Sequence, residues 1–228
     1  MNTLLETLFV SGFPLLSMAE VNTILMEIDR HVDTLDPSIT DYQRRKASVH
    51  SADGFSVDEL KAIYEPNGRL ELVSLPASIT DAVTNAVQRQ LPLVQRLLPS
   101  VTGIGDWIYV EYGVGQYITP HIDGVSSPTD SRKQIAGIGV WLNDDFEGGE
   151  FAVSTVIDEN LFGENRNEFV AYGVDNSVPW FRALCTTTWT AKPAAGDVLL
   201  YGSQTIHSTR PVVKGKARRL INFLTANG

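Results

Sequence analysis

Two histidines and an aspartate are the residues of this sequence best suited to chemistry: His121, Asp123 and His207. Two imidazoles and one carboxylate are the protein ligands of non-haem Fe(II) sites that leave coordination positions open for other reactants. On a β-strand, residues i and i+2 point to the same face, so His121 and Asp123 could bind one ion together. His207 directly follows the strand-like run DVLLY (197–201) and could reach the same ion from a second strand. We therefore predict a catalytic metal centre at these three residues.

A second His-x-Asp pair offers an internal comparison. His31 and Asp33 lie in a stretch with helical apolar spacing. Residues i and i+2 of a helix are about 200° apart, so this pair cannot chelate one ion, and we assign it to a solvated helix face. His50 follows the basic run RRK (44–46), and a structural or surface role is favoured over metal ligation.

The composition excludes several classes of protein. The 228 residues, 43% hydrophobic and 20% charged, are expected to form a single soluble domain over 1–228. A net charge of −9 argues against nucleic acid as a partner and against a basic membrane-surface helix. Cys185 is the only cysteine, which favours a reducing compartment. The N-terminus has neither a basic n-region nor an uninterrupted apolar run, so no signal peptide or membrane span is expected. We predict a cytoplasmic protein.

The first hundred residues carry helical signals. Ser17 with Glu20, and Ser56 with Glu59, form capping-box patterns before amphipathic stretches. A third amphipathic stretch is kinked or ended by Pro92. These features predict a helical N-terminal part over about 1–100.

Beyond residue 104 the sequence becomes rich in β-branched and aromatic residues punctuated by Gly and Pro, which is typical of strands. A jelly-roll part is placed at about 105–225, and helices followed by strands indicate an α+β fold with the helices on one side of a largely antiparallel β-structure. The expected strands are WIYVEY (107–112), IAGIGVWL (135–142), EFAVST (150–155), TTTWTA (186–191), DVLLY (197–201) and RLINFLT (219–225).

Two irregular segments are expected to border the substrate pocket. The segment 156–185 interrupts the strand region like a long insertion, and the loop near 40–55 lies among the helices. Long ordered loops tend to be functional, and such segments can act as lids that exclude water.

Several motifs follow one another in a characteristic order. They are Tyr112-Gly113-x-Gly115-Gln116, Pro120-His121-x-Asp123, Trp141-Leu142-Asn143, Gly148-Gly149-Glu150, Gly196-Asp197, and His207 followed by Pro211-Val212, Gly215 and Arg218. Any one of them is weak, but the ordered set over roughly 105–225 resembles the Fe(II)- and 2-oxoglutarate-dependent dioxygenases with a prolyl-4-hydroxylase-like catalytic domain. The resemblance implies a double-stranded β-helix, a relative of the jelly roll.

The resemblance also implies the cofactors and the reaction. His121, Asp123 and His207 would hold Fe(II), with 2-oxoglutarate and O2 as co-substrates and ascorbate as a reductant. The expected reaction is hydroxylation of an unactivated C–H bond, with release of succinate and CO2. Relatives that halogenate lack the carboxylate, so Asp123 favours oxygen chemistry, with desaturation or cyclisation left open.

A cation should bind the far carboxylate of 2-oxoglutarate, and an arginine suits this because its planar fork makes two charge-assisted hydrogen bonds. Related domains place this cation about ten residues after the distal histidine, where this chain has both Arg218 and Arg219. The chain departs from the common pattern by having two residues, not one, between Gly215 and the first arginine. Strand alternation turns the two side chains to opposite faces but does not choose between them. The family pattern favours Arg218, because Asn222 follows it by four, and Tyr112 is a further candidate contact.

The substrate is where the sequence says least. Arg132, Trp180 and Arg182 lie in segments that could border the open face of the iron. With no evident peptide-binding module, a free amino acid or other small-molecule metabolite is favoured as substrate. The alternatives are hydroxylation of a prolyl or other residue in a peptide or protein, and a non-catalytic metal- or ligand-binding jelly roll. The oligomeric state is left open.

Four aromatic residues are predicted to belong to the core and not to the pocket. They are Trp141, Phe146, Phe151 and Trp189.

Overall fold

A computed structural model describes residues 10–38, 55–123, 131–156, 179 and 186–227. Two of its helices begin at N-caps that the sequence supplies. α2 (Met18–Thr34) starts with a complete capping box between Ser17 and Glu20, and α4 (Val57–Tyr64) with one between Ser56 and Glu59. α5 (Ala77–Arg89) is followed directly by α6 (Leu91–Leu97), which carries Pro92 in its first turn, where the missing N–H costs nothing.

Most strands belong to one large antiparallel sheet with the order β1-β10-β6-β13-β4-β2, to which β3 adds by pairing with β13. The long strand β13 lies at its centre, between β6 and β4. The members are β1 (Val10–Pro14), β2 (Leu70–Leu72), β3 (Gly103–Ile104), β4 (Ile108–Tyr112), β6 (Arg132–Trp141), β10 (Asp197–Gly202) and β13 (Ala217–Asn227).

A smaller sheet has the order β5-β11-β8-β9, and β12 pairs with β7. These strands are β5 (Ile118–His121), β7 (Glu147–Gly148), β8 (Phe151–Val156), β9 (Thr186–Ala191), β11 (His207–Thr209) and β12 (Val212–Lys214). The two sheets form the jelly-roll core of an α+β fold, as predicted. Within the described residues, no helix combines the length and the apolar character that crossing a membrane would require.

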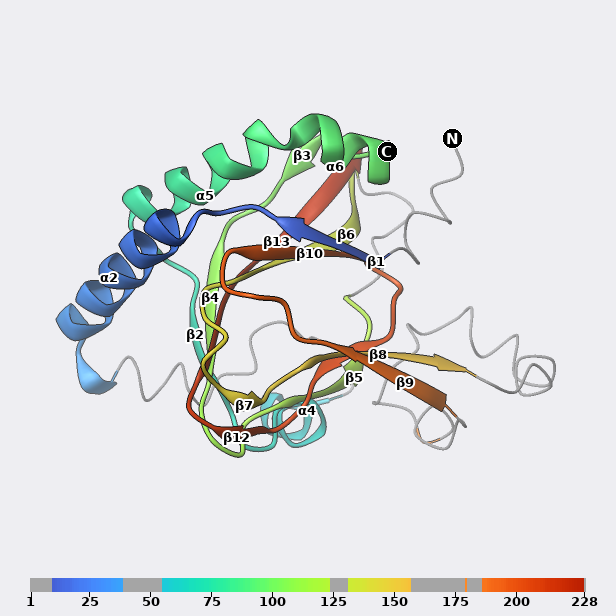
Figure 1. Ribbon diagram of the computed structural model, residues 1–228. Helices are drawn as coiled ribbons and strands as arrows, with labels where there is room; N and C mark the ends of the chain where they lie inside the picture. The colour runs from blue at the N-terminus through green and yellow to red at the C-terminus, as the bar shows by residue number, and fades with distance from the viewer. Residues whose placement is uncertain (1–9, 39–54, 124–130, 157–178, 180–185, 228) are drawn as a thin grey trace.

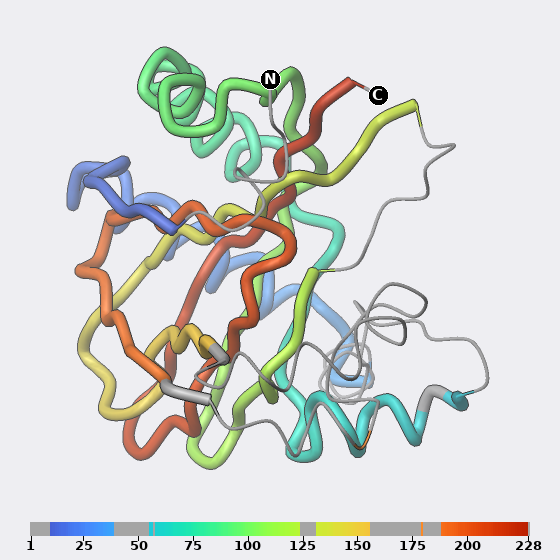
Figure 2. The backbone as a smooth tube through the Cα atoms, turned by 90° about the vertical axis from the view of Figure 1, so that its right-hand side faces the viewer, coloured from blue at the N-terminus to red at the C-terminus, as the bar shows by residue number. Residues whose placement is uncertain are grey.

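The large sheet is covered differently on its two faces. Helices α2, α5 and α6 lie on one side of it, while α4 lies at the far end of the molecule beside β5 (Figures 1 and 2). We call the helix-covered side the outer face, and the side turned toward the smaller sheet and α4 the inner face.

Strand alternation sends successive side chains of the central strands to these two faces. Ile138 and Leu220 pack into the apolar core with α2 and α5 on the outer face. Trp141 joins the core between the sheets, and Arg219 and Ile221 line a cavity on the inner face. Because both faces are largely buried, the strand sequences show no clear polar side.

The N-terminal part contains the expected helices, but it also contributes two strands that the sequence analysis did not expect. β1 and β2 both lie before residue 100, and they form the two edges of the large sheet. β2 is only three residues long, and β1 contains Gly12 and ends at Pro14, so neither carries a recognisable strand pattern.

Candidate active site

Two strands of the smaller sheet bring the predicted metal ligands together. His121 ends β5 and faces His207 of β11 as its direct cross-strand partner. Asp123 lies just beyond the end of β5, so strand alternation does not place it beside His121 as expected. Its place is fixed by backbone contacts: its N–H donates to the Ser203 carbonyl at 3.1 Å, and its carbonyl accepts from Gln134 Nε2 at 2.8 Å.

The hydrogen bonds of both imidazoles turn the same nitrogen toward Asp123. His121 Nδ1 lies 2.7 Å from the Thr119 carbonyl and His207 Nδ1 lies 2.8 Å from the Thr205 carbonyl, so each Nδ1 is the protonated donor. The Nε2 atoms of His121 and His207 lie 3.7 and 3.5 Å from Asp123 Oδ1. The Thr119 and Thr205 carbonyls thereby set the tautomer that a metal ligand needs.

The three side chains fit a metal ion. One ligand atom from each lies within 4.8 Å of the others, and the residues are only 4%, 7% and 5% exposed for His121, Asp123 and His207. Asp123 Oδ2 is buried without a hydrogen-bond partner in the described part of the chain. A buried carboxylate oxygen that lacks a donor is the observation that a cation would explain.

The charges of the group are coupled. Burial opposes ionisation of Asp123, but the charges of His207 and His121 outweigh it and hold the pKa of Asp123 below its ordinary value. Burial likewise lowers the pKa of His207, but the charge of Asp123 and the Thr205 carbonyl outweigh it and raise that pKa. The carboxylate is therefore ionised and ready to bind a cation.

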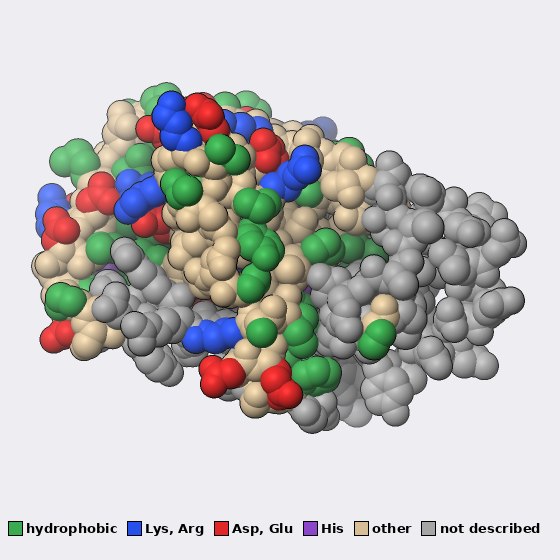
Figure 3. All heavy atoms as spheres, turned by 90° about the horizontal axis from the view of Figure 1, so that it is seen from below, with side chains coloured by type: hydrophobic (Ala, Val, Ile, Leu, Met, Phe, Trp, Pro, Cys, Tyr) green, Lys and Arg blue, Asp and Glu red, His purple; other side chains and the backbone are tan. Residues whose placement is uncertain are grey.

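The three predicted metal ligands lie on the wall of a cavity between the two sheets. Its walls combine apolar side chains with polar and charged groups. Little histidine surface of any kind is visible in the view from below (Figure 3). The lining residues are Arg69, Val110, Tyr112, Ile118, His121, Asp123, Gly139, Trp141, Phe151, Tyr201, His207, Thr209, Arg219, Ile221 and Phe223.

Arg219 is the most unusual group on this wall. It is 3% exposed, donates to Thr209 Oγ1 at 2.9 Å and to the Gly149 carbonyl, and lies 4.5 Å from the Trp141 ring centroid. It makes no ion pair with any carboxylate in the described residues, and its Nε has no hydrogen-bond partner there. Burial lowers the pKa of Arg219 to about 10, so the guanidinium is still charged at neutral pH. An unpaired buried cation favours an anionic ligand.

A sequence model of the 2OG-Fe(II) oxygenase superfamily matches residues 107–225, more than half of the chain. The chain belongs to this superfamily. No relative is found among curated proteins. Members of this superfamily use Fe(II), 2-oxoglutarate and O2, so the chain is an Fe(II)- and 2-oxoglutarate-dependent oxygenase.

Solved structures share the fold of this oxygenase. A viral collagen prolyl hydroxylase from Paramecium bursaria Chlorella virus-1, in a 2-oxoglutarate complex, has a TM-score of 0.54 at 14% identity and covers 96% of both chains. A prolyl-4-hydroxylase from Pseudomonas putida has a TM-score of 0.56 at 16% identity, covering 96% of this chain and 93% of its own. HygX from Streptomyces hygroscopicus, with nickel, 2-oxoglutarate and hygromycin B bound, has a TM-score of 0.56 at 16% identity, covering 98% and 85%.

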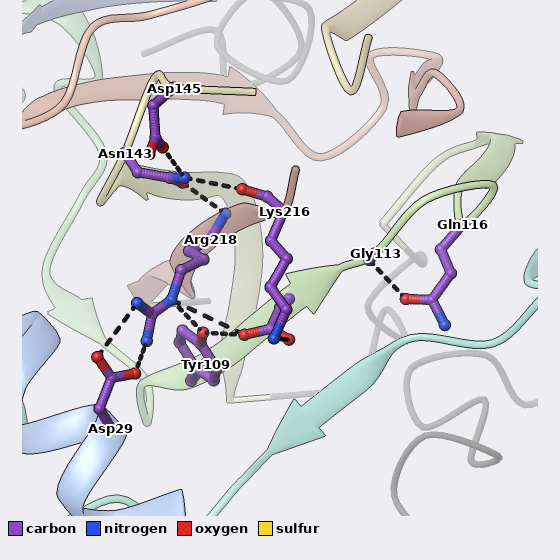
Figure 4. A network of polar contacts seen from close by, with 9 residues as sticks. Asp29, Tyr109, Gly113, Gln116, Asn143, Asp145, Lys216 and Arg218 are labelled. Atoms are coloured by element: carbon purple, nitrogen blue, oxygen red, sulfur yellow. Dashed lines mark hydrogen bonds and ion pairs between the residues drawn. The ribbon is translucent and has the colours of Figure 1, made fainter. Parts of the chain in front are cut away.

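Arg218, the arginine that the family pattern favoured, does not line the cavity, whereas Arg219 does. Arg218 lies on the outer face, where its guanidinium donates to Tyr109 at 2.7 Å and pairs with Asp29 of α2 (Figure 4). Adjacent strand residues alternate, so the neighbouring Arg219 is the one that reaches the cavity of the oxygenase. The family spacing favoured Arg218, but this chain has an extra residue after Gly215, so spacing alone does not decide between the two arginines.

Tyr112, the further candidate for a co-substrate contact, lines the cavity, and its neighbour Arg69 was not among the predicted site residues. Arg69 is 3% exposed, lines the cavity and donates to the Tyr112 hydroxyl. It also forms ion pairs with Glu65 and Glu71, both at 3.1 Å. Burial lowers the pKa of Arg69, but Tyr112 and the two glutamates outweigh it and raise that pKa. The only sequence signal was a basic residue between two acidic ones near a short strand, which is common on protein surfaces.

Tyr201 was also missed. It is 6% exposed, lines the cavity, and its ring centroid lies 4.5 Å from that of His207. Burial raises the pKa of Tyr201 well above its ordinary value, so the phenol stays protonated. Its position in the predicted strand DVLLY pointed to a packed aromatic.

Of the three predicted substrate contacts, the structure describes only Arg132. Arg132 is exposed at the start of β6 and is not among the residues that line the cavity. Trp180 and Arg182 lie outside the described residues, as do His50 and nearly all of the segments 156–185 and 40–55.

The predictions for the aromatic residues were confirmed in part. Trp141, Phe146 and Phe151 are buried, although Trp141 and Phe151 also line the cavity. Trp189 is 43% exposed, so its assignment to the core was wrong.

His31 behaves as expected of a helix residue. It lies in α2 with its Nε2 3.2 Å from the Ser74 carbonyl, far from the metal group in the fold.

Proposed function

We propose that this oxygenase hydroxylates an unactivated C–H bond of a free amino acid or other small metabolite. In this proposal His121, Asp123 and His207 hold Fe(II), and Arg219 binds the far carboxylate of 2-oxoglutarate. The observation that carries the proposal is the inner-face cavity, whose walls include three converging metal ligands and a buried arginine without a carboxylate partner. A dicarboxylate co-substrate would supply the anion that this wall lacks.

The residues would divide the work of binding and orientation. When bound, iron, 2-oxoglutarate and O2 would together supply the oxidising chemistry: one oxygen atom of O2 would go to the substrate, and the other to the succinate that forms as 2-oxoglutarate loses CO2. The carbonyls of Thr119 and Thr205 keep the two histidines in the ligand tautomer. Arg219 holds the co-substrate in one register, and the buried aromatic walls exclude water from the site.

The proposed substrate class rests on the burial and the lining of the site. The metal ligands are nearly fully buried, and the cavity combines apolar and aromatic side chains with converging polar and charged groups, as small-molecule sites do. The net charge of −9 opposes a polyanionic substrate. Hydroxylation of a prolyl or other residue in a peptide is the main competing outcome.

A binding measurement followed by a screen tests the proposal. Anaerobic titration should find one Fe(II) and one 2-oxoglutarate per chain. Succinate release should then be measured over free amino acids, small metabolites and prolyl peptides. Stimulation by a small metabolite supports the proposal, and stimulation by peptides alone would move the substrate to the peptide class. Failure to bind 2-oxoglutarate in the presence of Fe(II) would contradict the proposal that this cavity is the co-substrate site.

A further inference from the structure

The outer face of the large sheet carries a cluster of one arginine, one tyrosine and two acids. Arg218 Nε donates to the Tyr109 hydroxyl at 2.7 Å and lies 3.8 Å from Glu111 Oε2, while its Nη2 pairs with Asp29 (Figure 4). The Tyr109 hydroxyl in turn donates to Glu111 Oε2 at 3.0 Å. Every hydrogen-bonding group of this phenol therefore has a protein partner.

The inner face carries a cluster of the same composition. Arg69 Nη1 donates to the Tyr112 hydroxyl, and Nη2 lies 3.1 Å from both Glu65 Oε1 and Glu71 Oε2. All four residues are buried. The two clusters thus share an arginine that donates to a tyrosine oxygen and is neutralised by two carboxylates.

The difference between the clusters lies in the hydrogen of the phenol. A tyrosine hydroxyl has one hydrogen to donate, and Tyr109 gives its hydrogen to Glu111. The Tyr112 oxygen accepts from Arg69, and no acceptor for its hydrogen is found in the part of the chain that the structure describes. Tyr112 is 2% exposed and lines the cavity, so an acceptor within the cavity would satisfy it.

Arg219 connects this phenol with the proposed co-substrate anchor. The guanidinium carbons of Arg69 and Arg219 lie 5.5 and 5.6 Å from the centroid of the Tyr112 ring. Tyr112 and Arg219 therefore belong to the same stretch of cavity wall. A carboxylate bound there would bring acceptor oxygens to a wall that offers donors.

We propose that Arg69 is a positioning residue that fixes the Tyr112 hydroxyl as a hydrogen-bond donor to the co-substrate. Because Arg69 donates a hydrogen bond to the phenol oxygen of Tyr112, the hydrogen of that hydroxyl must point away from Arg69. The inference rests on the proposed function, because the acceptor is the 2-oxoglutarate carboxylate at Arg219. Arg69 lies outside the family-matched residues 107–225, so this contact comes from the N-terminal part of the chain.

A double-mutant cycle on 2-oxoglutarate affinity tests the inference. Anaerobic titrations of Fe(II)-loaded protein would compare Tyr112→Phe, Arg69→Lys and the double variant. Tyr112→Phe should weaken binding roughly tenfold, since it removes one hydrogen bond to a charged group. Arg69→Lys keeps a positive charge beside Glu65 and Glu71, and should also weaken binding several-fold. The double variant should bind within about twofold of Tyr112→Phe alone, because both changes remove the same interaction.

The outer cluster supplies matched controls. Arg218→Lys and Tyr109→Phe make the same chemical changes on the other face and should leave 2-oxoglutarate affinity unchanged. A purely structural role for Arg69 would lower the melting temperature without coupling to Tyr112 in the affinity. Additive effects of the two inner substitutions, or wild-type affinity in Arg69→Lys, would overturn the inference.

Two further variants keep the test decisive. If Arg69→Lys does not fold, Glu65→Gln with Arg69→Gln takes its place, because this pair preserves the net charge of the cluster. Arg219→Ala separates the inference from the proposed function. If Arg219→Ala binds 2-oxoglutarate like wild type, the proposed anchor is wrong. If Arg219→Ala loses binding while the Arg69 and Tyr112 effects are additive, only the inference fails.

Discussion

Two neighbouring arginines lie on opposite faces of the large sheet and differ in their partners. On the outer face Arg218 contacts Tyr109, Asp29 and Glu111, and helix α2 is tied to the sheet through it. On the inner face Arg219 is buried against Trp141 with no carboxylate partner among the described residues. Two adjacent arginines of one strand therefore differ: Arg218 is paired with protein groups, and Arg219 is buried without a carboxylate partner among the described residues.

The comparison separates stability from binding within one strand. The outer face holds the larger apolar core, in which residues of α2 and α5 pack on Ile138, Leu200 and Leu220. On the inner face, part of this space is a cavity, whose lining includes Gly139 and the three predicted metal ligands. Polar groups without protein partners cost stability, so their concentration on one face is evidence for a ligand there.

The largest expected effect comes from removing a metal ligand on the inner side. His207→Ala should abolish most turnover and reduce bound Fe(II) from about one per chain to near zero, because one of three protein ligands is lost. Iron content after anaerobic loading and desalting measures this. His31→Ala is the control, since His31 lies in α2 and contacts the Ser74 carbonyl. Equal iron content in the two variants would contradict the metal assignment.

The next effect compares the two arginines directly. Arg219→Ala should weaken 2-oxoglutarate binding about 30- to 1000-fold, which corresponds to about 2–4 kcal/mol for a lost charged, bidentate contact. Arg218→Ala should change that affinity by less than about threefold, and should instead lower the free energy of unfolding by about 1 kcal/mol. Anaerobic calorimetric titration and denaturant unfolding measure the two quantities. The reverse ranking would transfer the anchor to Arg218 and remove the distinction between the faces.

The smallest expected effect lies on the outer side, far from the cavity. Ser17→Ala removes the N-cap of α2, whose hydroxyl accepts from the Glu20 N–H at 3.3 Å. The free energy of unfolding should fall by about 1 kcal/mol, with no change in 2-oxoglutarate affinity. Denaturant unfolding and titration together check this. A changed affinity would mean that the two faces are not independent.

The sequence anticipated the features that depend on local patterns. The capping boxes at Ser17 and Ser56 marked two helix starts, and β-branched runs marked the main strands. The metal ligands were recognisable because their types and spacing are unusual, and the structure brings all three together. Even so, Asp123 is held by contacts with Ser203 and Gln134 that no local pattern announces.

Features that depend on contacts between distant segments could not be predicted from local sequence patterns. Alternation placed Arg218 and Arg219 on opposite faces, but both faces of β13 are buried, so hydrophobicity did not say which face held the cavity. Arg69 reaches the site because β2 pairs with β4 at the edge of the sheet, a pairing between segments about forty residues apart. Its importance follows from burial and from its contact with Tyr112, which only the folded arrangement shows.

The most direct test of the account is a crystal structure of the anaerobic complex with Fe(II) and 2-oxoglutarate. We expect the metal on Nε2 of His121 and His207 and on the Asp123 carboxylate, with the far carboxylate of 2-oxoglutarate on the Arg219 guanidinium. Arg218 should keep its contacts with Tyr109 and Asp29. A co-substrate carboxylate bound by Arg218, or a metal bound away from the three predicted ligands, would contradict the division of the sheet into a structural and a binding face.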